Sequence, residues 1–455
     1  MNNSNCNGPV QTKMDKSQSK NMAWWQLSLI GVGCTIGTGY FLGSTIGIQL
    51  TGPSIVFSFL LAAIGTYIVF ELLAKMTAAD PQKGSFCYYA SNAYGKWAGF
   101  SCGWNYWVSN ILIMGSQLTA LSILSQFWFP KTPLWVFAAI YAVLAIIVVL
   151  AGTKKFDQVE NVLAVIKVAA IVMFIILAVA GLIGLLDGKN YEMTIPNSFD
   201  GYFTGGLKGF WSSLIYAFYA FGGIEVIGMM AMQLKKTEDA TKAGSIMLLV
   251  LTIIYVLSLG LAVTTVALDV FDHKESPFVT AMERYHLAFF PHVFNGAIIV
   301  AGFSAMAAAL FGVTNLLMTL AEDGDAPKFF AKKVKFKELP LPAMGLGAAG
   351  LLASIITALL LPGKIYEYIT TAAGILLLFN WLFIIISALK ILKQNMWGKF
   401  ISIIAMIFIG FAVTGTWFEH TIRPGLYVSA GIAVLIGIIS IVIQKKHKKG
   451  QVKPT

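Results

Sequence analysis

The sequence predicts an all-α polytopic membrane protein, and three observations lead to this fold class. Hydrophobic residues make up 57% of the 455 residues and charged residues only 12%, which is about half of the charged share of a soluble domain. The mean hydropathy is +0.75. Apolar stretches of about 20 residues recur along the whole chain, and each is long enough to cross a hydrocarbon layer of roughly 30 Å.

These stretches are expected to form about twelve transmembrane helices, joined by short loops. Most of the 32 lysine and arginine residues fall in alternate loops, so the positive-inside rule places both ends of the chain in the cytoplasm. The same alternation accounts for the net charge of +11 without a nucleic-acid partner. The predicted spans lie near residues 24–48, 53–75, 97–126, 134–152, 157–185, 207–232, 244–269, 294–322, 341–361, 366–392, 399–417 and 424–444.

The predicted organisation is a single transmembrane domain over residues 23–444, preceded by a cytoplasmic tail (1–22) and followed by a basic cytoplasmic tail (445–455). The first tail is polar and has no short apolar region that ends in a cleavage site, so we do not expect a cleavable signal. The lysine-rich loop 328–337 is expected to set the topology, with binding of anionic lipid headgroups as the alternative. The four cysteines show no metal-binding spacing, and no metal or cofactor is expected.

The stretch IGVGCTIGTGYFLG, residues 30–43, is rich in glycine and has two interpretations. A dinucleotide-binding loop needs a third glycine at a fixed spacing and an acidic residue about 20 positions later. Ile36 stands where that glycine should fall, and no acidic residue lies between Asp15 and Glu71. The remaining interpretation is a membrane helix that breaks where it lines a cavity, or one that packs closely on its neighbours.

The sixth span favours the broken helix, because AFYAFGGIEVIG, residues 217–228, again places adjacent glycines in mid-membrane beside an acidic residue. Paired glycine-interrupted helices in two halves of a chain point to a transporter site. We therefore expect two five-helix repeats, near residues 24–185 and 207–392, followed by two further helices near 399–444. Since five is an odd number, the second repeat enters the membrane from the opposite side and the repeats are inverted.

The two breaks would suit the charged ends of an α-amino acid. Amides at the start of a half-helix attract a carboxylate, and carbonyls at the end of the preceding half-helix accept from an ammonium group. Tyr219 could cover the substrate as a gate, and ordinary helix packing is the alternative. The expected amide donors are Thr38 and Gly39, and the expected carbonyl acceptors are Thr35, Tyr219, Ala220 and Gly222.

Two ionisable residues are expected inside the spans. Lys167 falls seven to ten residues into the fifth span, roughly 10–15 Å deep at 1.5 Å per residue, where a cation is costly and indicates function. We expect it to take part in proton coupling, with its ammonium group in the place of a sodium ion; the alternative is that the side chain snorkels to the interface. Glu225 is a second candidate for proton handling, with hydrogen bonding to neighbouring helices as its alternative.

Several motifs, in order, resemble those of the amino acid–polyamine–organocation superfamily, in particular its bacterial amino acid permeases. They are IGVGCTIGTGYFLGSTIGIQLTGPS, GSFCYYASNAYGKWAGFSCGWNYW, VENVLAVIKV, FYAFGGIE and TLAEDGDAPKFFAK. The resemblance implies inverted five-helix repeats, carboxylate binding at Thr38 and Gly39, amino-group binding by carbonyls around Thr35 and Tyr219, and a gate at Tyr219. It also associates a lysine at the position of Lys167 with replacement of a sodium site. The sequence departs from the superfamily's pattern at Gln82, Gln233 and Asn315.

The predicted function is secondary active transport of amino acids in the cell membrane, as proton-coupled import by alternating access. No acidic residue other than Glu225 lies deep in a span, so no further carboxylate is expected to pair with a cationic substrate side chain. A neutral or hydrophobic amino acid is therefore favoured as the substrate. Exchange of one amino acid for another is the nearest alternative, and a membrane amino acid receptor is a more distant one. An enzyme is disfavoured, since no nucleophile–base pair or metal-ligand spacing is visible.

Overall fold

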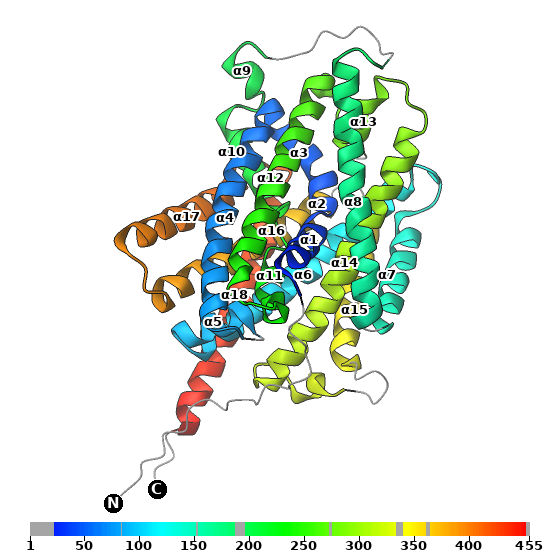
Figure 1. Ribbon diagram of the computed structural model, residues 1–455. Helices are drawn as coiled ribbons and strands as arrows, with labels where there is room; N and C mark the ends of the chain where they lie inside the picture. Colours follow the sequence, from blue (N-terminus) through cyan, green and yellow to red (C-terminus); the bar gives the residue numbers. More distant parts are fainter. Residues whose placement is uncertain are drawn as a thin grey trace, which may run out of the picture.

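The computed structural model describes residues 22–82, 84–151, 153–186, 196–272, 275–333, 340–360 and 365–451, and almost all of the regular structure there is helical (Figure 1). Residues 1–21 of the predicted tail 1–22, the last four residues and part of the lysine-rich loop 328–337 lie outside these ranges. The helices are α1 Trp24–Thr35, α2 Thr38–Phe41, α3 Gly43–Thr51, α4 Ile55–Ala79, α5 Ser85–Tyr94, α6 Lys96–Ser125, α7 Leu134–Leu150, α8 Thr153–Leu182, α9 Phe199–Tyr202, α10 Gly206–Tyr219, α11 Glu225–Met230, α12 Asp239–Thr265, α13 Pro277–Glu283, α14 Phe290–Glu322, α15 Leu341–Leu360, α16 Ile365–Ile391, α17 Met396–Gly415 and α18 Arg423–Gln451, with short 3₁₀ turns η1 Gly52–Ser54, η2 Ala231–Gln233, η3 Leu268–Val270 and η4 Lys328–Ala331.

The polytopic helical fold class is confirmed. Within the described residues, eight helical segments are long and apolar enough to cross a membrane, and α7 and α15 supply two shorter apolar helices. Every predicted span falls on a helix, except the two spans predicted to break, of which the first falls on α1, α2 and α3 and the sixth on α10 and α11. The boundaries differ by a few residues, because capping and turn contacts, and not hydropathy, decide where a helix ends.

The contacts between helices follow the pattern that two repeats would need. α6 contacts α16 as α14 contacts α8, and α1 contacts α12 as α10 contacts α4. α1 also contacts α8 as α10 contacts α16. In each comparison, the second pair is obtained from the first by replacing every helix with the helix that holds the same position in the other predicted repeat. The inversion of the repeats and their exact boundaries remain a prediction that this pattern favours.

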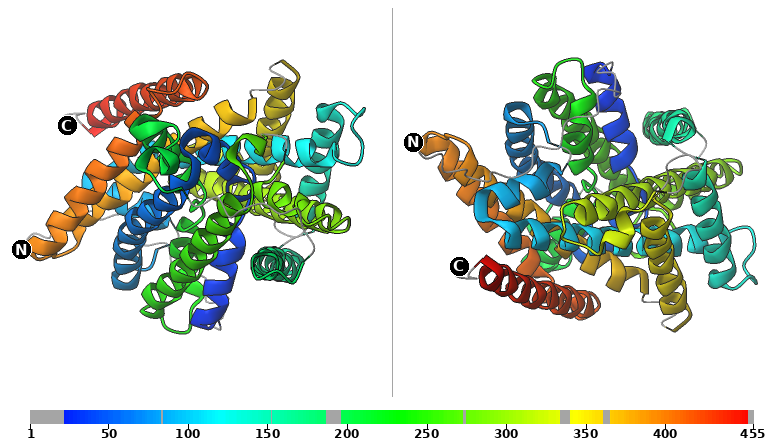
Figure 2. Two further views of the ribbon diagram at one scale, coloured as in Figure 1. Left: turned by 90° about the horizontal axis from the view of Figure 1, so that it is seen from above. Right: turned by 90° about the horizontal axis from the view of Figure 1, so that it is seen from below.

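The two helices after the predicted repeats lie at the edge of the bundle, where α17 and α18 flank α16 (Figure 2). Large apolar side chains on both are exposed, among them Ile407 and Val434, which are 64% and 62% exposed. In a membrane such a face is covered by lipid chains, which are as apolar as the side chains. α17 and α18 therefore shield the bundle and contribute little to its centre.

Two short helices fall where the hydropathy pattern predicted loops. α5 lies between α4 and α6, and α13 lies within the polar segment 272–292 that precedes α14. α13 begins with Pro277 and all of its residues from Pro277 to Met282 are buried. It packs on α12 and α14, so this connection covers one end of the bundle.

The start of α1 is attached to the segment that follows α11. The backbone N–H of Met22 donates to the Gln233 carbonyl oxygen (3.1 Å), and the Lys235 N–H donates to the Met22 carbonyl oxygen (3.0 Å). The Lys242 ammonium also lies 4.3 Å from the centre of the Trp24 ring, close enough for a cation–π contact. The ends of two helices that are far apart in the sequence are thus held together.

Candidate functional site

The first predicted break is present between α1 and α2. α1 ends at Thr35, Ile36 and Gly37 are extended, and the helix resumes at Thr38. The N–H groups of Gly37, Thr38 and Gly39 donate no backbone hydrogen bond to another described residue. Four amides at a helix start lack intrahelical acceptors, so this break offers donors to an anion.

The second predicted break separates α10, which ends at Tyr219, from α11, which begins at Glu225. Gly223 has a φ of +112°, a conformation that only glycine adopts without strain. A Cβ atom at this position would also lie 3.1 Å from the Cys34 carbonyl oxygen and 3.3 Å from the Thr35 Cα atom. The glycine therefore allows the two breaks to meet backbone against backbone.

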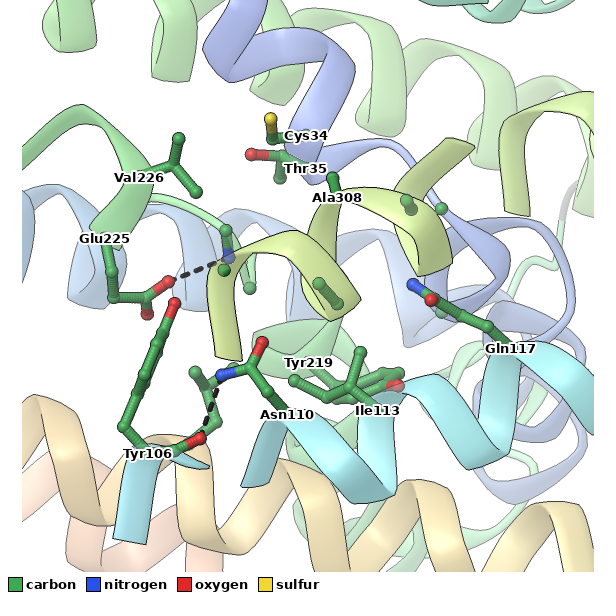
Figure 3. A pocket seen from close by; sticks show the side chains of 18 of the residues that line it. Cys34, Thr35, Tyr106, Asn110, Ile113, Gln117, Tyr219, Glu225, Val226 and Ala308 are labelled. Carbon is green, nitrogen blue, oxygen red and sulfur yellow. Dashed lines mark hydrogen bonds between the residues drawn. The ribbon is translucent and has the colours of Figure 1, made fainter. Parts of the chain in front are cut away.

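A cavity of about 90 Å³ lies where the breaks meet (Figure 3). This space can hold several water molecules, and it suits a small organic ligand. Backbone and side chains of both broken helices line it, together with one face of α6 and small residues of α14. The lining residues are Cys34, Thr35, Gly37, Gly39, Tyr106, Asn110, Ile113, Gln117, Tyr219, Ala220, Gly222, Gly223, Glu225, Val226, Met229, Ala305, Ala308, Ala309, Gly312 and Leu377.

The structure brings together most of the residues predicted for the site. Thr35, Gly39, Tyr219, Ala220, Gly222 and Glu225 all line the cavity. Thr38 itself does not line the cavity, but it lies between Gly37 and Gly39, which do. Its buried hydroxyl has no hydrogen-bond partner among the described residues. Of the predicted carbonyl acceptors, those of Tyr219 and Ala220 already accept from the Gly222 N–H (3.0 Å) and the Tyr255 hydroxyl (3.1 Å). Each carbonyl oxygen retains a second lone pair for a ligand.

Tyr219 covers one side of the cavity. Its hydroxyl shares a 2.6 Å hydrogen bond with the Ser116 hydroxyl of α6. Its ring lies directly over Gly39, where a Cβ atom would be 2.6 Å from the ring carbon Cε1. Close by, the Tyr366 hydroxyl of α16 donates to the Thr38 carbonyl oxygen at 3.1 Å. These contacts join α2, α6, α10 and α16 in one closed layer.

Beyond this layer, an aromatic cluster fills the space between α2, α12 and α13. The rings of Tyr40 and Tyr255 stack with their centres 4.0 Å apart, and Phe278 of α13 packs against Tyr40 and Phe41. On the opposite side, the cavity follows Ala305 to Gly312 towards the end of α14. The site is thus sealed towards α13 and reaches towards the end at which α14 finishes.

Lys167 lies behind the cavity, with no exposed surface. Its Nζ atom donates to the Gly33 carbonyl oxygen at 2.6 Å, near the end of α1. The side chain therefore does not snorkel to an interface. Because the carbonyls at a helix end carry partial negative charge, they are a favourable place for an ammonium group.

Glu225 is also buried, and its two carboxylate oxygens have different partners. Oε1 accepts from the Trp381 indole N–H of α16, and Oε2 accepts from the Gly223 N–H at 3.0 Å. The side chain of Tyr106 runs from α6 towards this carboxylate (Figure 3). Glu225 thus connects the second break with α16 and faces the cavity wall that α6 supplies.

Residues on α6 and α14 were missed from the sequence. Tyr106, Asn110, Ile113 and Gln117 all line the cavity, and their spacing of three or four places them on one helix face. Polar side chains on one stripe of an apolar helix are the signal that could have identified them. The small residues of α14 carry no such signal, because a membrane helix uses alanine and glycine for packing as well.

Two of the three departures from the superfamily's pattern make local contacts away from the cavity. The Gln82 amide donates to Asp80 Oδ1 at 2.7 Å, and the Asn315 amide donates to the Phe311 carbonyl oxygen at 3.0 Å. Gln233 supplies the backbone carbonyl that pairs with Met22.

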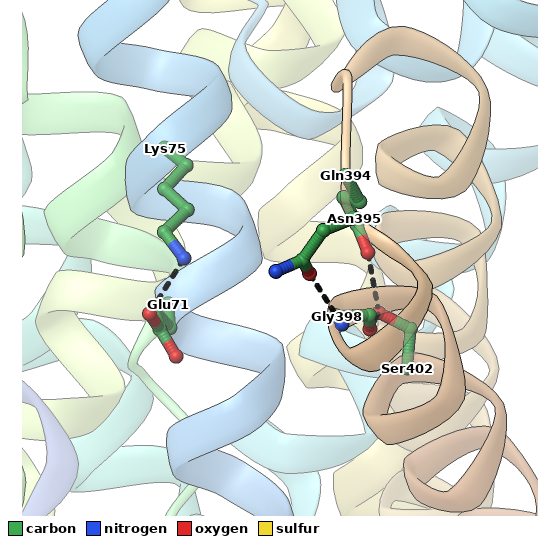
Figure 4. A network of polar contacts seen from close by, with 6 residues as sticks. All are labelled: Glu71, Lys75, Gln394, Asn395, Gly398 and Ser402. Carbon is green, nitrogen blue, oxygen red and sulfur yellow. Dashed lines mark hydrogen bonds and ion pairs between the residues drawn. The ribbon is translucent and has the colours of Figure 1, made fainter.

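Charged residues at the end of α4 lie apart from the cavity. Lys75 and Glu71 form a 2.6 Å ion pair one helical turn apart, next to the start of α17 (Figure 4). There the Asn395 side chain accepts from the Gly398 N–H at 2.8 Å and caps α17. Such exposed pairs contribute little to stability. In the described ranges, no group of three or more His, Cys, Asp or Glu residues could hold a metal ion.

Comparison with known proteins identifies the family. A family model described as amino acid permease matches residues 26–453. An uncharacterized transporter of Bacillus subtilis (strain 168), YcgH, is 54% identical over 98% of this chain and 100% of its own length. The aromatic amino acid transport protein AroP of Corynebacterium glutamicum is 30% identical over 84% of this chain and 83% of its own length. The gamma-aminobutyric acid permease of Bacillus subtilis is 27% identical, with 96% of each chain covered.

Proposed function

The chain belongs to the amino acid permease family, and we propose that it imports neutral amino acids by alternating access, driven by protons. The observation that carries this proposal is the meeting of two broken helices at one cavity. One break offers amides from Gly37 to Gly39, and the other offers carbonyl oxygens. This arrangement suits a ligand with a carboxylate and an ammonium group on one carbon atom.

The charges around the cavity favour a neutral substrate side chain. Glu225 is the one Asp, Glu, Lys or Arg among the described lining residues. Both of its oxygens already accept hydrogen bonds, from Trp381 and Gly223, and the described lining residues include no second acid to pair with a cationic substrate side chain. Apolar and small residues, such as Ile113 and Ala308, make up the wall along α6 and α14. We therefore place neutral or hydrophobic amino acids first among the substrates.

The contact between Lys167 and Gly33 supports proton coupling. A cation on a helix-end carbonyl takes the position that a metal ion would otherwise need, and a lysine can release its proton when its surroundings change. Loss of the proton would free the end of α1, so protonation and the position of α1 would be linked. Glu225 is the second group that we propose to handle protons.

The direction of the cavity supports an inward-facing state. With both chain ends in the cytoplasm, as the positive-inside rule predicts, α13 lies outside and α14 finishes inside. The layer of Tyr219 and Tyr366 would then form the closed outer gate, and the cavity would reach towards the cytoplasm. Alternating access would open the outer layer and close the inner end.

Uptake into vesicles tests the function. The purified protein is reconstituted, and a panel of labelled amino acids is offered with and without an inward pH gradient. We expect gradient-driven uptake of at least one neutral amino acid, lost in Lys167→Ala and kept in Lys208→Ala, which changes an exposed lysine. Uptake that ignores the gradient and requires internal amino acid would instead make the protein an exchanger. Binding without any flux would make it a receptor.

A further inference from the structure

Gln117 is the most unusual polar side chain at the cavity. It lies on α6, is 6% exposed and lines the cavity. Its Oε1 atom has no hydrogen-bond partner in the part of the chain that the structure describes. The neighbouring Thr38 is fully buried, and its Oγ1 atom likewise has none there. Buried polar atoms in native proteins are almost always paired, so the unpaired Oε1 atom of a residue that lines the cavity indicates that a ligand supplies its partner.

The position of the Gln117 carboxamide shows which part of a ligand it meets. A Cβ atom on Gly37 would lie 3.5 Å from Gln117 Nε2, so the amide stands directly beside the first break. The unpaired N–H groups of residues 37–39 begin at that point. Nε2 and these N–H groups are all donors, and a cluster of donors without a fixed positive charge is suited to a carboxylate.

We propose that Gln117 is a substrate-binding residue whose Nε2 donates to the α-carboxylate of the transported amino acid, beside the Thr38 hydroxyl and the amides of the first break. The inference rests on the proposed function. An α-amino acid carries acceptor oxygens and donor N–H groups on one carbon atom, so one bound molecule supplies partners for Nε2, for Oε1 and for Thr38. The amide stays neutral at every physiological pH, so this contact does not depend on protonation.

A carboxylate-specific test follows, with Gln117→Met, which keeps the length of the side chain and removes its donor. Inhibition of labelled uptake is measured with the best substrate of the panel and with its methyl ester, which lacks the carboxylate charge. We expect the inhibition constant of the acid to rise about tenfold, as the loss of one charge-assisted hydrogen bond predicts. The constant of the ester should change less than about threefold.

The control is Gln126→Met, the same substitution at the residue that directly follows α6. Gln126 donates to the Thr132 carbonyl oxygen at 2.9 Å and lies outside the cavity, so both constants should stay as in the wild type. Thermal unfolding in detergent shows whether either variant is folded. If Gln117→Met fails to fold, the near-isosteric Gln117→Glu takes its place. We expect this variant to bind the acid weakly at neutral pH and more tightly as the pH falls, because only a protonated glutamate can donate.

The outcomes separate the inference from the function on which it rests. An equal rise for acid and ester in Gln117→Met would show that Nε2 does not meet the carboxylate and would overturn the inference, as would an unchanged constant for the acid. A Gln117→Glu variant that binds the acid as tightly as the wild type at neutral pH would also overturn it. If the wild type takes up no amino acid of the panel, the proposed function itself fails.

Discussion

The ammonium group of Lys167 on α8 lies 2.6 Å from the carbonyl oxygen of Gly33 on α1, and nothing of the lysine reaches the surface. The lysine does not line the cavity. We therefore expect Lys167→Met to separate binding from transport. Substrate affinity in detergent should change less than about threefold, whereas gradient-driven uptake should fall at least about tenfold, equivalent to 1.4 kcal/mol or more. A matched Lys208→Met variant should keep both, and a parallel loss of binding and uptake in Lys167→Met would contradict a coupling role.

Gly39 is expected to tolerate no side chain. A Cβ atom there would lie 2.6 Å from the Tyr219 ring, so Gly39→Ala must displace the ring that covers the cavity. We expect uptake to fall at least about tenfold, since closure errors of about 1 Å can cost two orders of magnitude. Gly43→Ala is the control, because its Cβ would have ordinary contacts of 3.7 Å with the Tyr366 hydroxyl. Equal uptake by the two variants would show that Tyr219 does not form part of the gate.

Glu225 and Trp381 are expected to act as one unit. Glu225→Gln leaves a single oxygen for two donors, the Trp381 indole and the Gly223 N–H, and Trp381→Phe removes one donor. A hydrogen bond to a charged group contributes about 1.5–3 kcal/mol, so each variant should lose about tenfold or more in uptake. The double variant should be no worse than the worse single one. Additive losses in this double-mutant cycle would show that the two residues act independently.

The α14 side of the cavity is expected to decide how large a substrate side chain can be. A Cβ atom on Gly312 meets no atom within 4 Å, and Gly312 lines the cavity. Gly312→Val should therefore reduce uptake of the largest substrates about tenfold, with glycine or alanine affected less than about threefold. Gly296→Val, at another open position of α14, should leave the ranking unchanged. If both variants rank the substrates by uptake in the same order, the substrate side chain does not lie beside Gly312.

Glu275 is expected to make stability depend on pH. It lies outside the membrane-spanning helices, where burial, and then Glu283 and Asp272, raise the pKa of its carboxyl above the usual 4.5. A group whose pKa is raised on folding contributes its full stabilisation below the unfolded pKa and loses it as the pH rises through the folded pKa. Glu275→Gln should thus melt above the wild type at neutral pH and equal it below about pH 4.5. A variant that melts lower at neutral pH would contradict this sign.

The helices and their breaks could be predicted from the sequence because each rests on a local pattern. Apolar length defined the spans, and closely spaced glycines around Gly37 and the adjacent pair Gly222 and Gly223 marked the breaks, since lipid tolerates an unpaired backbone only where it lines a cavity. The burial of Lys167 followed from its depth in a span. The roles predicted for these residues remain proposals.

The other half of the site could not be predicted, because it depends on how helices rotate against each other. From the sequence alone, Gln117 and Asn110 cannot be told from other polar residues of α6, because the sequence does not show which face of this helix contacts the breaks. The partner of Glu225 is Trp381, 156 residues later in the chain, and no local pattern connects them. Gly312 matters through the space around it, which only the packed structure defines.

The backbone pairing of Met22 with Gln233 and Lys235 has a consequence for biosynthesis. Met22 leaves the ribosome early, and its two partners are more than two hundred residues away in the sequence. During translation the start of α1 therefore lacks these two hydrogen bonds until the segment after α11 has been synthesised and inserted into the bilayer. A chain truncated ahead of that point cannot close the bundle at this end.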